Sequence, residues 1–161
     1  MREDEFERVF EAHAQGLLGF LTYRTGDRAL AEDILADTFE RVLRARRRFD
    51  PRKAGEKTWI YSIALNLVRD QARRRDAESR ALGRVRDPEP APVGPLEDIA
   101  VRDELSRALA QLSDEEREAI SLRFGADLAV PEIARLKGEK LTTVEGRVYR
   151  GLAKLRDLLE G

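Results

Sequence analysis

Apolar residues recur at intervals of three and four along most of the chain, which is the spacing of one face of an α-helix. The first such segment carries Phe6, Val9, Phe10, Leu17, Phe20 and Leu21. A second, over residues 30–43, follows Asp27, a residue type that commonly caps the first turn of a helix. A third begins near Trp59, after a polar loop over residues 49–57. The pattern therefore predicts three helices in the first half of the chain.

A proline-rich segment interrupts this pattern in the middle of the chain. Residues 87–95 contain four of the six prolines, and proline both prevents helix continuation and favours extended backbone. We therefore expect residues 82–96 to form a linker between two structural units, residues 1–81 and residues 97–161.

Signals for helix starts and turns mark the second unit. Ser113 and Glu116 have the spacing of a capping box, and Pro131 suits the first turn of a short helix over residues 130–137. A final helix is expected from about Thr142. Neither unit shows the alternating pattern of a strand. The predicted fold class is all-α, with two small helical bundles on a linker.

Composition narrows the possible function classes. The 161 residues include no cysteine and one histidine, His13, which excludes disulfides, thiolate chemistry and multi-histidine metal sites. No nucleophile–base pair or phosphate-binding glycine loop is present, so we expect neither an enzyme nor a cofactor. We interpret His13 as a packing or surface residue. The chain lacks a long apolar run and a signal-peptide core, so we expect no membrane contact and a cytoplasmic location.

The near-zero net charge of −1 conceals a strong asymmetry. Residues 1–40 hold four basic and ten acidic residues, a net charge of −6, whereas residues 41–75 hold twelve basic and three acidic residues, a net charge of +9. Basic clusters that flank Trp59 and Tyr61 favour nucleic-acid binding, since arginine neutralises phosphate and aromatic rings stack on unpaired bases. The alternative is a solvated helix end favoured by the helix dipole.

The second unit contains a candidate helix-turn-helix. Ala134, Gly138 and Val144 have the spacing of a small contact residue, a turn glycine and a core plug. The second helix would then lie in a major groove, where side chains near its N-terminus can contact phosphates or base edges. The candidates for these contacts are Thr142, Thr143, Arg147 and Arg150. An ordinary helical hairpin is the alternative.

Taken in order, these features resemble the extracytoplasmic-function (ECF) family of bacterial RNA polymerase sigma factors, over nearly all 161 residues. Residues 31–39 resemble the segment that docks on the clamp helices of the polymerase β′ subunit. Residues 59–70, followed by three arginines, resemble the helix that melts the promoter and reads the minus-ten element. The positions that resemble the minus-thirty-five-reading domain are Leu112, Ser113, Arg117, Leu122, Arg123, Phe124, Glu132, Ile133, Ala134, Gly138, Thr143, Val144, Arg147 and Arg150.

The resemblance implies a role for each set of residues. It implies polymerase binding by Glu32, Asp33, Asp37 and Phe39. It implies minus-ten DNA contacts by Lys57, Trp59, Tyr61, Asn66, Arg69, Arg73 and Arg74. It implies minus-thirty-five contacts by Lys140, Thr142, Thr143, Arg147 and Arg150. The implied partners are core RNA polymerase, through its β′ clamp helices and β flap, promoter DNA and an anti-sigma factor.

Several alternatives remain open from the residues alone. Trp59 and Tyr61 can equally be core residues, and Asn66 can satisfy backbone groups inside the bundle instead of reading a base. The chain also departs from the usual family pattern at Ala36, Lys137, Glu139, Glu145 and Gly146. A glutamate in a recognition helix repels phosphate, and a glycine there weakens the helix. The competing functions are a stand-alone helix-turn-helix regulator and a sigma-like interaction module without promoter activity.

Overall fold

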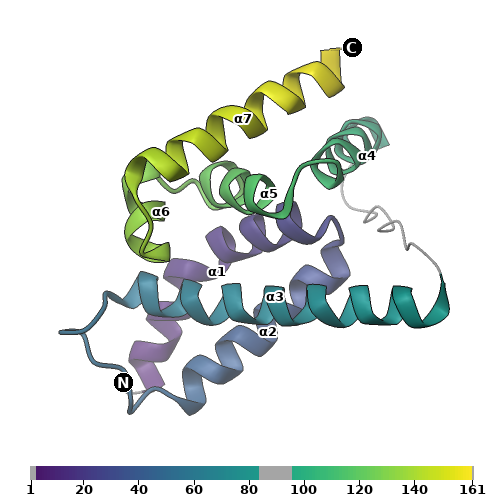
Figure 1. Cartoon of the computed structure of the whole chain (residues 1–161). Coiled ribbons are helices and arrows are strands. Elements are labelled where there is room, and N and C mark those ends of the chain that lie inside the picture. The colour runs from purple at the N-terminus through teal and green to yellow at the C-terminus, as the bar shows by residue number, and fades with distance from the viewer. Residues whose placement is uncertain (1–2, 84–95, 161) are drawn as a thin grey trace.

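The computed structural model describes residues 3–83 and 96–160, which form helices and connecting turns without a strand (Figure 1). The N-terminal bundle comprises α1 (Glu3–Thr25), α2 (Arg28–Arg44) and α3 (Glu56–Leu82). The C-terminal bundle comprises α4 (Leu96–Ala110), α5 (Asp114–Ile120), the π-helix η1 (Ser121–Gly125), α6 (Val130–Lys137) and α7 (Leu141–Glu160). The all-α prediction is confirmed. Most of the predicted linker lies outside the described residues.

The N-terminal bundle buries most of the apolar stripes that the spacing predicts, whereas Phe10 of the first stripe is 43% exposed. The Asp27 side chain accepts a hydrogen bond from the Leu30 backbone N–H at 3.2 Å, so it caps α2 as expected. Helix α3 begins at Glu56, slightly before the predicted start, and extends to Leu82. The core residues of this bundle are Val9, Leu17, Phe20, Leu21, Ala31, Ile34, Phe39, Val42, Ile60, Tyr61, Ala64, Leu65 and Val68.

The C-terminal bundle contains the predicted capping box and the predicted helix-turn-helix. The Ser113 hydroxyl accepts from the Glu116 N–H at 3.2 Å, and the Glu116 carboxylate accepts from the Ser113 N–H at 3.1 Å. Gly138 ends α6 with a φ of 65°, a backbone conformation that glycine adopts without strain. Ala134 and Val144 are buried between α6 and α7, as the spacing predicts. The π-helix η1 follows α5 directly, without an intervening turn.

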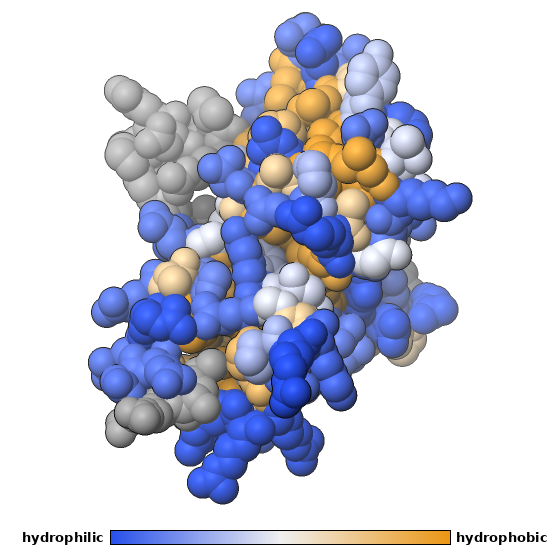
Figure 2. Space-filling model, turned by 90° about the vertical axis from the view of Figure 1, so that its left-hand side faces the viewer, coloured by the Kyte–Doolittle hydropathy of each residue, from blue (hydrophilic) through white to orange (hydrophobic). Residues whose placement is uncertain are grey.

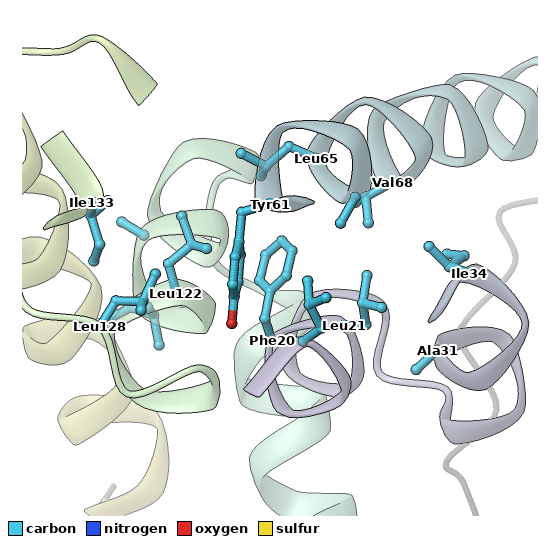
Figure 3. Close-up of a cluster of buried hydrophobic side chains, with 14 of the residues drawn as sticks. Phe20, Leu21, Ala31, Ile34, Tyr61, Leu65, Val68, Leu122, Leu128 and Ile133 are labelled. Carbon is cyan, nitrogen blue, oxygen red and sulfur yellow. The ribbon is translucent and has the colours of Figure 1, made fainter. Parts of the chain in front are cut away.

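The two bundles share one continuous core. Helix α1 contacts η1 and α3 contacts α6, so the C-terminal bundle covers one side of the N-terminal bundle (Figure 1). Tyr61 lies in this interface, between Phe20 of α1 and apolar residues of the C-terminal bundle (Figure 3). Helix α2 packs on α1 and α3, on the side of the N-terminal bundle that faces away from the C-terminal bundle. One surface of the N-terminal bundle is therefore covered, and the other is open.

Candidate polymerase and nucleic-acid interfaces

An acidic face lies on α2, away from the C-terminal bundle. Glu32, Asp33 and Asp37 are exposed, because the buried stripe of α2 is formed by other residues. Glu32 pairs with Arg28 at 3.1 Å, one helical turn earlier. Asp33 and Asp37 have no ion-pair partner within residues 3–83 and 96–160. Asp33 and Asp37 can therefore meet a basic protein surface without losing an internal contact.

Phe39 occupies a different place from these three acidic residues. It is 4% exposed, and its ring meets Phe10 edge-on with ring centroids 4.8 Å apart. Phe6 approaches it from a second direction, at 6.3 Å between centroids. Phe39 therefore supports the α2 surface from inside the bundle, while the half-exposed Phe10 is the aromatic residue of this cluster that reaches solvent.

The residues predicted to contact the minus-ten element divide into two groups along α3. Asn66, Arg69 and Arg73 are exposed and follow the three- and four-residue spacing of one helix face, and Arg74 is exposed beside them. Tyr61, one turn earlier, is 1% exposed. Asn66 thus points away from the bundle interior, whereas Tyr61 lies inside the core in this conformation.

Two further residues of this set lie at the start of α3. The Trp59 ring is partly buried and stacks on Phe49, with 4.8 Å between the ring centroids. Phe49 comes from the loop between α2 and α3, so this stack ties the loop to the helix. Lys57 is exposed, and its ammonium group lies 3.3 Å from the Glu132 carboxylate of α6. Lys57 is therefore in contact with the C-terminal bundle.

The predicted minus-thirty-five residues lie on or just before α7. Lys140, Thr142 and Arg150 are exposed, and Thr143 is half-buried. The Arg147 side chain is only 15% exposed, because its guanidinium group pairs with Glu139 and lies 3.9 Å from Glu115. Lys140 and Thr142 are thus free to approach DNA, whereas Arg150 lies 3.9 Å from Glu116 and Arg147 is held by two carboxylates of its own bundle.

A chain of ion pairs links α3 to α7 and explains two of the unusual turn residues. The Lys137 ammonium group is 2.5 Å from Glu118 and 2.9 Å from Glu139, and its side chain is 7% exposed. Glu118 also pairs with Arg69 at 3.3 Å, and Glu139 pairs with Arg147. Lys137 and Glu139 therefore occupy a polar junction between the bundles. A leucine at position 137 would leave both carboxylates with fewer partners.

The pKa of the Glu118 carboxyl reflects this junction. Burial by itself raises the pKa, but the hydrogen bond from Lys137 and the charges of Lys137 and Arg69 outweigh it and hold the pKa below its ordinary value. A carboxyl with a lowered pKa stabilises the fold above its unfolded-state pKa, and this contribution is lost as the pH falls through the lowered value. The ion-pair chain is therefore intact at neutral pH.

One exposed aromatic residue of α7 escaped the sequence analysis. Tyr149 on α7 is 76% exposed, beside the predicted contact residue Arg150. This exposed aromatic could have been noticed because it directly follows Val148, which belongs to the buried apolar stripe of α7. Figure 2 shows apolar side chains in the upper part of one face and hydrophilic ones below. The exposed apolar side chains of α7 are Leu141, Leu152, Leu158 and Leu159.

In the two described parts of the chain, no helix combines the length and the apolar character that crossing a bilayer requires.

Gly146 lies within α7 and has no steric reason to be glycine. A Cβ at this position would meet only the flexible guanidinium group of Arg150, at 2.9 Å. Nothing in the structure explains this glycine.

Comparison with known proteins identifies both bundles. Residues 9–78 match the family model of Sigma-70 region 2, and residues 102–155 match that of Sigma-70, region 4. The chain is 36% identical to the RNA polymerase sigma factor CarQ of Myxococcus xanthus, over 98% of this chain and 90% of CarQ. It is 31% identical to the ECF RNA polymerase sigma factor SigX of Bacillus subtilis, over 98% of this chain and 85% of SigX.

Solved structures agree with these sequence relationships. The fold superimposes with a TM-score of 0.78 on the sigma factor RpoE of Bartonella quintana, which was solved in complex with the anti-sigma factor NepR. That match covers 97% of each chain at 26% identity. The similarity extends through both bundles in the same order. A stand-alone helix-turn-helix regulator would need only the C-terminal bundle, so this order favours a sigma factor. The chain therefore belongs to the extracytoplasmic-function family of sigma factors, which direct RNA polymerase to promoters.

Proposed function

We propose that three separate surfaces carry out the sigma activity of this chain. The acidic face of α2 docks on the polymerase β′ clamp helices through Glu32, Asp33 and Asp37. The observation that carries this proposal is the separation of charge on one small bundle. Unpaired carboxylates are exposed on α2, whereas exposed guanidinium groups lie on α3, where the Arg73 side chain is 78% exposed. Opposite charges on separate faces favour two different partners, a basic protein surface and a polyanion.

The exposed face of α3 contacts the minus-ten element. An amide such as that of Asn66 can both donate to and accept from a base edge, and neighbouring arginines can neutralise the phosphates. A melted strand presents unstacked bases, and the stacked pair of Phe49 and Trp59 lies beside the start of α3, where such a base can be received. The nucleotide chemistry belongs to the polymerase, and this chain supplies recognition and strand capture.

The helix-turn-helix contacts the upstream element. Helix α7 places Thr142, Thr143 and Arg150 on or near its exposed side, and Lys140 lies just before it. The exposed leucines of α7 form an apolar surface suited to a polymerase segment, for which we propose the β flap. The C-terminal bundle would then hold DNA and polymerase at the same time.

An anti-sigma factor is the proposed regulator, in the cytoplasm where the polymerase works. The Bartonella quintana relative was solved in complex with such a partner. Recovery of tagged chain from its native host should yield a sequestering protein. Constitutive activity of the chain, with no such protein recovered, would remove this part of the proposal.

The test is transcription in vitro with bacterial core RNA polymerase and the promoter region of the chain's own operon. A discrete transcript that requires this protein, and is absent with core enzyme alone, is the expected result. Its start site then locates both promoter elements. Core binding without any transcript, on this and on related promoters, would favour the interaction-module hypothesis. Duplex binding by the free chain, with no binding to core enzyme, would favour the stand-alone regulator.

A further inference from the structure

A cluster of three charged side chains joins α1 to the first residue of α3. The Glu56 carboxylate accepts a hydrogen bond from Arg8 at its Oε1 atom and one from His13 at its Oε2 atom, each over 2.8 Å. His13 is the only histidine of the chain, and its side chain is 13% exposed. Both carboxylate oxygens therefore have a partner on α1, and α1 holds the start of α3 by contacts that are distant in sequence.

These two contacts keep the Glu56 carboxyl group ionised at neutral pH. Partial burial by itself raises its pKa, but the hydrogen bonds from Arg8 and His13 outweigh this effect and hold the pKa below its ordinary value. An ionised carboxylate only accepts hydrogen bonds, so the Nε2 atom of His13 is the donor in this contact.

Glu56 also marks the point at which the loop between α2 and α3 ends. Gly55 is the N-cap of α3, and it has no side chain that could hydrogen-bond the first turn. A carboxylate in the first turn is favourable there, because it lies near the positive end of the helix dipole. The contacts of Glu56 with α1 therefore fix the junction between loop and helix where no side-chain cap does so.

The loop over residues 45–55 carries charge that favours its spreading. It contains five basic residues and one acidic residue, and a chain segment of like charges repels itself and extends. Within the loop, the Asp50 carboxylate accepts from the Arg52 N–H at 2.9 Å. The Phe49 ring then stacks on Trp59, which lies one helical turn after Glu56. A junction held at Glu56 limits the positions that Phe49 can reach relative to Trp59.

We propose that Glu56, held by Arg8 and His13, is a positioning residue for base capture at the minus-ten element. The cluster fixes the junction of the loop with α3, and it thereby sets the spacing of the Phe49 and Trp59 rings that receive an unstacked base. Glu56 is turned toward α1 and acts without touching the DNA. The inference rests on the proposed function of α3, and it adds a determinant of base selectivity that lies outside the DNA surface.

The single tryptophan of the chain provides the first test. Because Trp59 is the only tryptophan, the fluorescence of the full chain reports on its stack with Phe49. Glu56→Ala removes both contacts with α1, and alanine is a good helix former, so the circular dichroism of the chain should not change. We expect quenching of Trp59 fluorescence by acrylamide to accelerate about twofold, in proportion to the population with an open stack. Unchanged quenching would overturn the positioning role.

Two substitutions at His13 separate its hydrogen bond from the space that its ring fills. The amide of His13→Gln can donate to Glu56 as the imidazole does, whereas His13→Leu fills a similar volume without a donor. We expect His13→Gln to be quenched like the unsubstituted chain and His13→Leu to be quenched faster. Equal quenching of the two variants would overturn the part assigned to His13. Glu11→Ala, which removes an exposed carboxylate from α1, is the control and should change nothing.

The second test measures base selectivity with the holoenzyme. Labelled single strands that span the minus-ten element, located from the transcription start site, are changed one base at a time, and fluorescence anisotropy gives their affinities. In Glu56→Ala the preference for the correct base should fall about fivefold at one position, where a base contact is lost. The slope of log affinity against log salt should stay the same, because no phosphate contact is lost. Affinity for core polymerase should also stay the same.

The outcomes separate the positioning role from the proposed function. An equal loss of affinity for every strand, with selectivity kept, would show that Glu56 only stabilises the fold, and it would overturn the inference. Faster quenching with unchanged affinity and selectivity would also overturn it, because the stack would then have no part in the choice of base. Failure of the unsubstituted holoenzyme to prefer any base in the strand would instead count against the proposed function of α3, and the positioning role would fall with it.

Discussion

The acidic face of α2 and the basic surface of α3 and α7 differ in how far the protein itself satisfies their charges. Asp33 and Asp37 are exposed and, within the described residues, unpaired. Arg69 and Arg147 each pair with carboxylates of the C-terminal bundle. A group that already has an internal partner gains less from a new one, because the first contact must be lost. The comparison teaches that Asp33 and Asp37 can meet a partner without losing an internal contact, whereas Arg69 and Arg147 must give up an ion pair before they can contact another molecule.

The largest expected effect comes from reversing the charge of the acidic face of α2. Asp33→Arg with Asp37→Arg should weaken binding to core polymerase by about 100-fold, since like charges at an interface cost several kcal/mol. The fold should survive because both side chains are exposed and contribute no internal ion pair. Fluorescence anisotropy of labelled chain with core enzyme measures the change.

A matched charge reversal on α1 provides the control. Glu7→Arg with Glu11→Arg changes the net charge equally, on exposed positions of a neighbouring helix. It should reduce polymerase affinity much less than the α2 variant. Equal losses in the two variants would show that general charge, and not the α2 face, governs docking.

The next largest effect is expected from a substitution on the exposed face of α3. Asn66→Ala removes an amide that projects from the helix, so open-complex formation should fall about tenfold if one bidentate base contact is lost. Core binding should remain unchanged. Permanganate footprinting of the melted strand measures the first quantity, and anisotropy measures the second. Gln71→Ala, an amide at a partly buried position of the same helix, should leave both unchanged; a parallel loss of both in Asn66→Ala would indicate a structural role.

The sequence predicted the local structure of both bundles well, because local signals determine it. The Asp27 cap, the Ser113 capping box and the Gly138 turn each depend on residues within one helical turn. The helix of residues 130–137 has the predicted limits. Apolar spacing likewise identified the core, because a helix buries one stripe whatever covers it.

The contact between the bundles could not be predicted in the same way. It depends on Gly19 and Gly125, which are more than a hundred residues apart and carry no side chain whose pattern could be read. The sequence left Tyr61 open between a core residue and a DNA contact, and periodicity alone cannot decide which bundle covers it. Lys137 was noticed as unusual, but its partner Glu118 lies on another helix.

Arg147 on α7 tests the basic side of the comparison, because its guanidinium group already pairs with Glu139. Arg147→Ala should reduce affinity for the upstream element about fivefold and lower the slope of log affinity against log salt by about one, the value for one lost phosphate contact. Titration of promoter fragments with holoenzyme at several salt concentrations measures both. Arg156→Ala, near the exposed end of α7, is the control. No change in affinity or slope would mean that Arg147 serves only its bond to Glu139.

The smallest effect is expected from removing a single negative charge on α7. Glu145 is exposed on the turn after Thr142 and Thr143, where a carboxylate faces any phosphate that those residues approach. Glu145→Gln keeps the helix propensity and the size of the side chain, so it changes the charge and little else. Affinity for the upstream element should rise about two- to threefold, because surface charge contacts contribute only ~0.2–1 kcal/mol each.

The salt dependence distinguishes this cause from a change in structure. Removing a repulsive charge should raise affinity most at low salt, since screening weakens the repulsion as the ionic strength increases. Asp157→Asn, three turns further along α7, removes the same charge far from the expected groove and should have no effect. If both variants raised affinity equally, the improvement would come from net charge alone. If Glu145→Gln lowered affinity, its carboxylate would be accepting a hydrogen bond from a cytosine amino group, and the helix would be reading sequence there.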